Sequence, residues 1–264
     1  MRPRGKPARA GSGFLRESGG AIDCSLLPGD KSFSRLLPAF LFPYLAYVGL
    51  GSLPPHLISP EGAGLLRFAV VAALLAAFRG EYRFGARMTA RQMAIAFAAA
   101  AAAFAIWVVS YRLSLALPWW HTHIAAAESS RPTTAYWILR SVNSVLLVPV
   151  FEELFCRAYL SELFIGASKG LGGFFPALGR RMDAYPEPLG APPISTASVI
   201  GSTALFTLGH DVSAWIPAML YFGFTTWVYA RTRSFRLCMA VHALTNLAIA
   251  AVVWRQPAMQ FLWF

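Results

Sequence analysis

The chain has 264 residues, of which 56% are hydrophobic and only 13% are charged. Soluble domains carry about 25% charged residues, so this composition excludes an ordinary soluble protein and predicts a polytopic membrane protein. A net charge of +11 would suggest nucleic-acid binding in a soluble chain. Here the lysines and arginines lie between hydrophobic segments, where they set orientation in a bilayer, and we therefore exclude nucleic-acid binding.

The N-terminal part of the chain divides at the first apolar run. Residues 1–35 are rich in Lys, Arg, Gly, Pro and Ser, which predicts a disordered basic cytoplasmic tail. Residues 36–264 predict a single transmembrane helical domain. Apolar runs at 36–53, 62–78 and 92–111 predict its first three spans. These spans carry no recognisable motif, so we expect them to bear on neither substrate nor partner.

The second half of the chain mixes polar connectors with apolar runs. Residues 112–143 are too polar to span, and His121 and His123 beside two tryptophans indicate a loop at headgroup level rather than a metal site. The connector at 166–193 is rich in Gly and Pro and predicts no span. Four more spans are expected at 142–165, 194–210, 213–230 and 237–254. The predicted fold class is therefore all-α, a transmembrane helical bundle of about seven spans, in a range of roughly six to eight.

The distribution of Lys and Arg between the connectors predicts the orientation. Most of them fall on the same side as the N-terminal tail. By the positive-inside rule the N-terminus is cytoplasmic and the C-terminus lies outside. Aromatic residues at 256–264 predict an interfacial anchor.

Three charged residues lie within residues 151–160, inside the fourth predicted span. Ionisable groups there cost about 2.5–3.5 kcal/mol each on insertion scales, so they are usually paired or functional. Glu153 and Arg157 are four residues apart, with the acid first, which predicts an ion pair on one helical face. Glu152 is rotated by about 100° from Glu153 and is left as the carboxylate without that partner. Pro149 predicts a kink one turn earlier.

Two later spans carry polar residues at the same four-residue spacing. Phe206 and His210 lie on one face of their helix, and His242 and Asn246 lie on one face of another. Intramembrane polar residues usually face the bundle interior or a wet cavity. We therefore expect these polar side chains to converge with Glu152.

A convergent glutamate, two histidines and an asparagine point to attack by an activated water. A carboxylate in an apolar cavity is a stronger base than in water, and His210 could share the proton. His242 and Asn246 would donate hydrogen bonds to a developing oxyanion. Cys156 has no histidine near it in sequence, so packing is favoured over a nucleophilic role. The three scattered cysteines form no C-x-x-C and predict neither a disulfide nor a thiolate metal site.

These groups, in this order, resemble the CAAX prenyl protease and bacteriocin-processing (CPBP/Abi) family of intramembrane glutamic endopeptidases. The family pattern is E-E-x-x-x-R, then F-x-x-x-H, then H-x-x-x-N on separate spans. Here the pattern is carried by Glu152, Glu153 and Arg157, by Phe206 and His210, and by His242 and Asn246. The resemblance covers about residues 140–255, which we expect to be the catalytic core.

The resemblance implies a CAAX-type protease that hydrolyses a peptide bond of a membrane-associated or exported protein, without a metal or other cofactor. It implies that water is activated by Glu152 and His210 and that the oxyanion is stabilised by His242 and Asn246. Structural support of the site would come from Glu153, Arg157 and Phe206. The residues around the motifs, 148–150 and 245–247, look most like the bacterial branch associated with exosortase-type sorting, which implies a bacterial inner membrane. The expected partners are the lipid bilayer and a protein or peptide substrate, one that could carry a C-terminal sorting segment.

Three other functions compete with this interpretation. Two glutamates and two histidines could bind zinc in a membrane metalloprotease, although no H-E-x-x-H is present. A non-enzymatic immunity or scaffold protein could keep the fold, although no motif residue is lost. A transporter could use intramembrane carboxylates, although no repeat between halves is visible.

The predicted spans give the site residues different depths. Glu152 lies roughly 15 Å into its helix, His210 near the outer end of its span, and His242 about 8 Å from the inner end of its own. A single site therefore requires the span before His210 to begin deeper or continue past it, or the last span to begin above the inner interface. We expect the resulting cavity to open to the outer face, because His210 and the loop at Trp119 and Trp120 lie there.

Overall fold

The computed structural model describes residues 33–82, 84–117, 133–178 and 194–256. The N-terminal tail up to residue 32, the pair His121 and His123, and the aromatic residues at 257–264 lie outside these ranges. What the sequence predicts for them stays a prediction.

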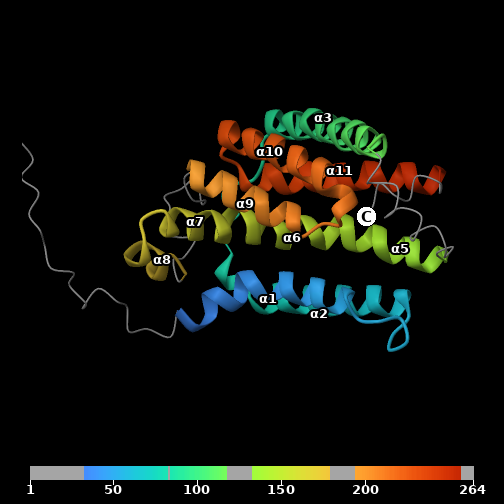
Figure 1. Ribbon diagram of the computed structural model, residues 1–264, viewed down its shortest axis with the longest axis horizontal. Coiled ribbons are helices and arrows are strands. Elements are labelled where there is room, and N and C mark those ends of the chain that lie inside the picture. The colour runs from blue at the N-terminus through green and yellow to red at the C-terminus, as the bar shows by residue number, and fades with distance from the viewer. Residues whose placement is uncertain (1–32, 83, 118–132, 179–193, 257–264) are drawn as a thin grey trace, which may run out of the picture. The chain divides into compact units, whose positions relative to one another are not determined.

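All regular secondary structure in the described ranges is helical, which confirms the all-α class (Figure 1). The long separate helices are α1 (Phe33–Gly51), α2 (Pro60–Ala77), α3 (Ala90–Leu115), α9 (Thr196–Leu208), α10 (Trp215–Thr232) and α11 (Phe235–Arg255). Two short 3-10 turns in connections are η2 (Arg79–Glu81) and η8 (Val212–Ala214). The long helices coincide closely with the predicted apolar runs.

Capping residues fix where several of these helices begin. Ser59, Thr89 and Ser195 are the N-cap residues of α2, α3 and α9, and each side chain accepts a hydrogen bond from a backbone N–H of the first turn. Thr89 and Ser195 complete reciprocal capping boxes. These contacts satisfy backbone donors that have no partner within the helix, so the chain turns into helix at these points.

The fourth predicted span belongs to a longer helical run through the middle of the bundle (Figure 1). Its consecutive segments are α5 (Thr134–Val142), η5 (Asn143–Leu147), α6 (Val148–Glu153), η6 (Leu154–Leu160) and α7 (Ser161–Ala167). The run therefore starts well inside the stretch that we expected to be too polar to span. Both η5 and η6 are π-helical, so wider turns flank the six residues of α6. Pro149, which has no N–H to donate, lies directly after the first of them.

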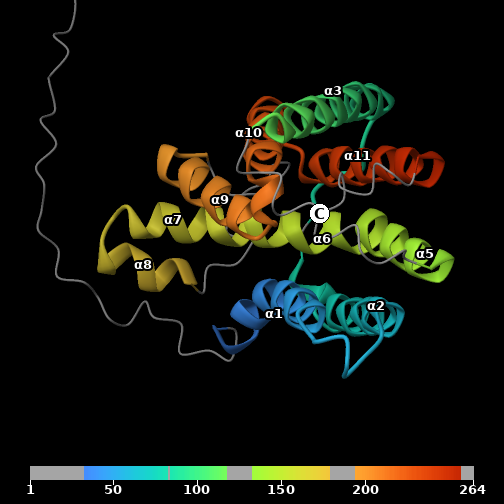
Figure 2. The same ribbon diagram turned by 45° about the vertical axis from the view of Figure 1, so that its right-hand side comes forward.

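The central run separates two groups of helices in both views (Figures 1 and 2). The paired helices α1 and α2 pack on one side, and α3, α10 and α11 pack on the other. Stacked aromatic rings join α1 to the centre, with the Tyr44 and Phe155 centroids 4.3 Å apart and those of Phe40 and Tyr159 6.1 Å apart. This packing holds α6 between the two groups.

A short helix, α8 (Leu171–Leu178), lies inside the connector that we predicted to hold no span. It folds back against α7, where glycines allow the backbones to meet: a Cβ on Gly166 would lie 2.5 Å from the carbonyl oxygen of Gly173. Gly170 adopts φ +76° in the turn between them, a conformation that glycine reaches without strain. The glycines that suggested a loop are therefore the residues that permit close helix packing.

The described helices include three that are long and apolar enough to cross a membrane. These are residues 60–77, 90–114 and 235–255, while 38–51 and 196–208 form shorter apolar helices. Large apolar side chains such as Phe97, Val109 and Leu113 are more than half exposed, as expected for surfaces that face lipid. The chain is an integral membrane protein, and the exact number of spans stays a prediction.

Candidate active site

A cavity of about 240 Å³ lies between the central helix, α9 and α11. Glu152 reaches it from α6, His210 from the turn after α9, and His242 and Asn246 from α11. The structure therefore brings together the four side chains that the sequence expected to converge. Phe206 lines the same cavity.

Glu153 and Arg157 form a buried ion pair beside this cavity, and each side chain is only 2% exposed. The guanidinium also donates to Thr226 Oγ1 at 2.7 Å and to Thr225 Oγ1 at 2.5 Å, both on α10. The ring of Phe222 lies 4.4 Å below the guanidinium carbon. These partners from α10 hold Arg157, and Arg157 in turn holds Glu153.

His242 is the histidine that lies against both carboxylates. Its Nδ1 is 3.3 Å from Glu153 Oε1, and its Nε2 is 3.8 Å from Glu152 Oε2. Because a carboxylate accepts, Nδ1 carries the hydrogen toward Glu153 and Nε2 is the ring atom that faces Glu152. From the sequence we predicted that His210 shares the proton with Glu152. The position of His242 beside Glu152 was not predicted.

Glu152 itself is only partly engaged. Its Oε2 is buried and has no hydrogen-bond partner among the described residues, and its side chain is 15% exposed. A buried carboxylate oxygen without a donor is costly, so such an atom marks a place where water or substrate is expected to bind.

His210 is held by its own helix and by its neighbours. Its Nδ1 lies 2.8 Å from the carbonyl oxygen of Phe206 and therefore carries the hydrogen of that bond. This tautomer leaves Nε2 as an acceptor. The Phe206 ring lies 4.6 Å from the imidazole, and Trp215 Nε1 donates to the His210 carbonyl at 3.1 Å. The four-residue spacing thus orients the histidine through a backbone bond as well as through ring packing.

Asn246 completes the polar lining. Its Nδ2 donates to the carbonyl oxygen of Ser144 at 2.7 Å, which ties α11 to the π-helical segment η5. An amide nitrogen carries two hydrogens, so one remains after this bond. The fixed amide can present that hydrogen to a group bound in the cavity.

The site lies within a segment that matches a known protein family. Residues 134–248 match the family described as type II CAAX prenyl endopeptidase Rce1-like. These residues form a domain of the CAAX protease family. Comparisons with curated proteins and with solved structures gave no match. The family prediction is confirmed for residues 134–248, this domain indicates a CAAX-type peptide hydrolase, and the exosortase-associated branch stays a prediction.

One helix of the CAAX protease domain is shorter than the span that the sequence predicts. The structure gives α9 only 13 residues, or roughly 20 Å, which is less than the hydrocarbon core of about 30 Å. The turn that carries His210 therefore need not lie at the far interface. The helix ends at Leu208 and the chain turns back into α10, and the depths of the site residues in the membrane stay a prediction.

Three cavity residues come from helices that precede the CAAX protease domain. Tyr47 of α1, Arg67 of α2 and Trp107 of α3 all line the cavity with Glu152. The expectation that the first three spans bear on neither substrate nor partner is therefore not supported for the site. The sequence contained one signal for this role, because Arg67 is the single charge inside the second apolar run.

Proposed function

We propose that the protein is an intramembrane endopeptidase that hydrolyses a peptide bond of a membrane-associated or exported protein by a water activated by Glu152 and His210. The observation that carries this proposal is the unpartnered Oε2 of Glu152 in a cavity shared with His210, His242 and Asn246. The family of residues 134–248 supports the reaction class.

The chemistry begins with a water held between Glu152 and the scissile carbonyl. Glu152 takes a proton as the water oxygen bonds to the carbonyl carbon, and Nε2 of His210 is a second acceptor for that proton. The carbonyl π electrons move onto its oxygen and give a tetrahedral oxyanion. When the C–N bond breaks, the proton held by the glutamate passes to the leaving amine, and the atoms balance as peptide plus water to acid plus amine.

The oxyanion needs donors that are already in place. The remaining Nδ2 hydrogen of Asn246 is one, because Ser144 fixes the amide. Nε2 of His242 is the other when it carries a hydrogen, since Glu153 accepts from Nδ1 and fixes the orientation of the ring. Glu153 is in turn fixed by Arg157, so the ion pair supports the donor rather than the base.

Proteolysis by the purified full-length chain in lipid nanodiscs tests this function. A library of synthetic peptides is incubated with the protein, and new termini are detected by mass spectrometry. We expect defined cleavage sites at a rate that scales with protein concentration. A folded protein that cleaves nothing would favour the non-enzymatic immunity or scaffold role instead.

Metal chelators are expected to leave this activity unchanged. Within the described residues no group of three or more His, Cys, Asp or Glu has the arrangement of a metal site. Glu153 beside His242 is already occupied by Arg157, which removes one candidate ligand. Activity measured before and after EDTA treatment, together with metal analysis, checks this. Loss of activity in step with loss of one zinc per chain would instead support the zinc-dependent protease.

The cavity is proposed to open to the outer face of a bacterial inner membrane, with the N-terminus in the cytoplasm. Cysteines placed at 210 and 246, in a background lacking the native cysteines, are expected to react with an impermeant thiol reagent added from outside. A cysteine at 103 is the comparison, because Ala103 is fully buried and does not line the cavity, so it should react poorly from either side. Labelling only from the cytoplasm would contradict the outward opening and favour a substrate presented from inside.

A further inference from the structure

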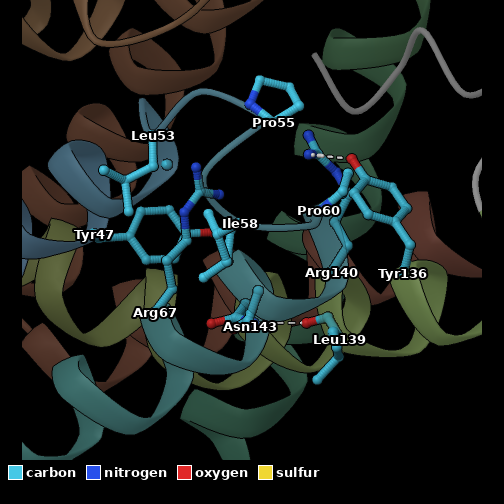
Figure 3. Close-up of a pocket in the computed structure, with 13 residues that line it drawn as sticks. Tyr47, Leu53, Pro55, Ile58, Pro60, Arg67, Tyr136, Leu139, Arg140 and Asn143 are labelled. Carbon is cyan, nitrogen blue, oxygen red and sulfur yellow. Dashed lines mark hydrogen bonds between the residues drawn. The ribbon is translucent and has the colours of Figure 1, made fainter.

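A second cavity of about 250 Å³ adjoins the catalytic one (Figure 3). It lies between the end of α1, the loop that follows it, the start of α2, and α5. Tyr47, Arg67 and Arg140 line both cavities, so the two are neighbours that share a wall. We call the second cavity the arginine pocket.

Arg67 is built into one wall of the arginine pocket. Its guanidinium carbon lies 4.9 Å from the centre of the Tyr47 ring, and its Nη2 lies against the Cα of Gly51, where a Cβ would collide with it. Its Nε is buried and donates to no described acceptor. The fold therefore makes room for this cation and leaves a buried donor without a partner, which is costly unless a ligand supplies the acceptor.

Arg140 and Asn143 form the opposite wall. Arg140 Nη1 donates to Tyr136 Oη at 3.0 Å, and Figure 3 shows this pair across the pocket from Arg67. Asn143 donates through Nδ2 to the carbonyl oxygens of Gly64 and Leu139, while its buried Oδ1 accepts no hydrogen bond. No carboxylate is among the described residues that line the pocket. The pocket thus offers two cations and one acceptor amide oxygen.

We propose that the arginine pocket binds a carboxylate of the peptide substrate and thereby positions the peptide for Glu152. Two guanidinium groups match a carboxylate, and the free Oδ1 of Asn143 matches a peptide N–H beside it. Since a carboxylate and a phosphate both have acceptors only, the donor for Asn143 Oδ1 must come from a group beside the anion, and the peptide backbone supplies an N–H at that place. Because the pocket shares a wall with the catalytic cavity, we assign the bound carboxylate to the substrate of that cavity. This inference therefore rests on the proposed endopeptidase function.

The carboxylate can come from the C-terminus or from an Asp or Glu side chain. Matched peptide libraries separate these sources: free C-terminal acids, C-terminal amides, and amides with a single Asp or Glu. For wild-type protein in neutral nanodiscs we expect cleavage of a carboxylate-bearing set to exceed that of the uncharged amides by roughly 10- to 100-fold. The set that carries the preference identifies the source.

Variants of the pocket test the assignment. Arg67→Gln is expected to remove the preference between libraries, so that the carboxylate-bearing peptides are cleaved no faster than the uncharged amides. Arg67→Lys should keep part of it, and Gly51→Ala should reduce it without altering any charge, because the new methyl displaces the guanidinium. Arg79→Gln is the control, since this exposed arginine lies in η2 away from the pocket.

Binding separates this inference from catalysis. Fluorescence anisotropy of labelled peptides on the Glu152→Gln protein, which lacks the proposed base, should show the same preference for the carboxylate and its loss with Arg67→Gln. If the wild-type protein cleaves no peptide but binds peptides with this preference, the result would contradict the proposed function and support the pocket assignment. Equal binding of acids and amides, or a preference retained in Arg67→Gln, would overturn the pocket assignment. Equal binding of acids and amides, together with weaker retention of anionic lipid by Arg67→Gln than by the parent protein, would assign the arginines to lipid phosphate and also overturn it.

Discussion

Replacing Glu152 by glutamine is expected to reduce peptide hydrolysis about 10²- to 10⁴-fold, the range for loss of a general base. The protein should remain folded, because glutamine has nearly the same shape and Oε2 of Glu152 has no hydrogen bond to lose. Removing a buried carboxylate also removes the cost of keeping its charge away from water. Initial cleavage rates, together with thermal unfolding of the same nanodisc samples, measure both effects.

Two control variants sharpen this test. Glu81→Gln removes a carboxylate from η2, outside the cavity, and should leave the rate unchanged. Cys156→Ala should also remain active, because the thiol is 2% exposed within the packed core. A Glu152→Gln protein with wild-type activity would exclude this carboxylate as the base.

Breaking the buried ion pair is expected to cost about 3–5 kcal/mol of folding free energy. Glu153→Ala leaves the Arg157 guanidinium charged and 2% exposed, and Arg157→Ala leaves the Glu153 carboxylate in the same position. Since typical domains are stable by only about 5–15 kcal/mol, either variant should give much less folded protein. The amount of folded protein recovered in detergent and its unfolding temperature are the measurements.

The double variant Glu153→Leu with Arg157→Met removes both charges together. It should recover much of the stability that either alanine variant loses, because no buried charge is left without a partner. It should not recover activity, since His242 loses the acceptor of its Nδ1–H. Normal yield and stability of both alanine variants would refute a structural role for the pair.

The motif faces could be predicted because helical spacing is a local property. Glu153 and Arg157 pair within one helical run, and the Phe206 carbonyl meets the His210 ring across the same four-residue step. Such contacts follow from the 3.6-residue turn and hold even where the pair reaches into the π-helical segment η6. The sequence alone therefore indicated which side chains share a face.

Contacts between helices could not be predicted in the same way. Which histidine lies against Glu152 depends on the placement of α11 beside α6, and the structure gives this position to His242. The role of α1 and α2 was missed for the same reason, because Tyr47 and Arg67 reach the cavity only through packing across the central helix. The α8 helix was missed because its glycines favour both a loop and close packing.

The most direct test of the central claim follows oxygen from solvent into the product. Wild-type protein is incubated with the peptide library in water enriched in oxygen-18, with and without hydroxylamine, beside Glu152→Gln and Cys156→Ala. We expect a single oxygen-18 in each new C-terminal carboxylate for wild type and Cys156→Ala, no hydroxamate, and new termini at a rate about 10²- to 10⁴-fold lower for Glu152→Gln. Hydroxamate products that disappear with Cys156→Ala, or labelled termini at the wild-type rate with Glu152→Gln, would contradict direct attack by a water that Glu152 activates.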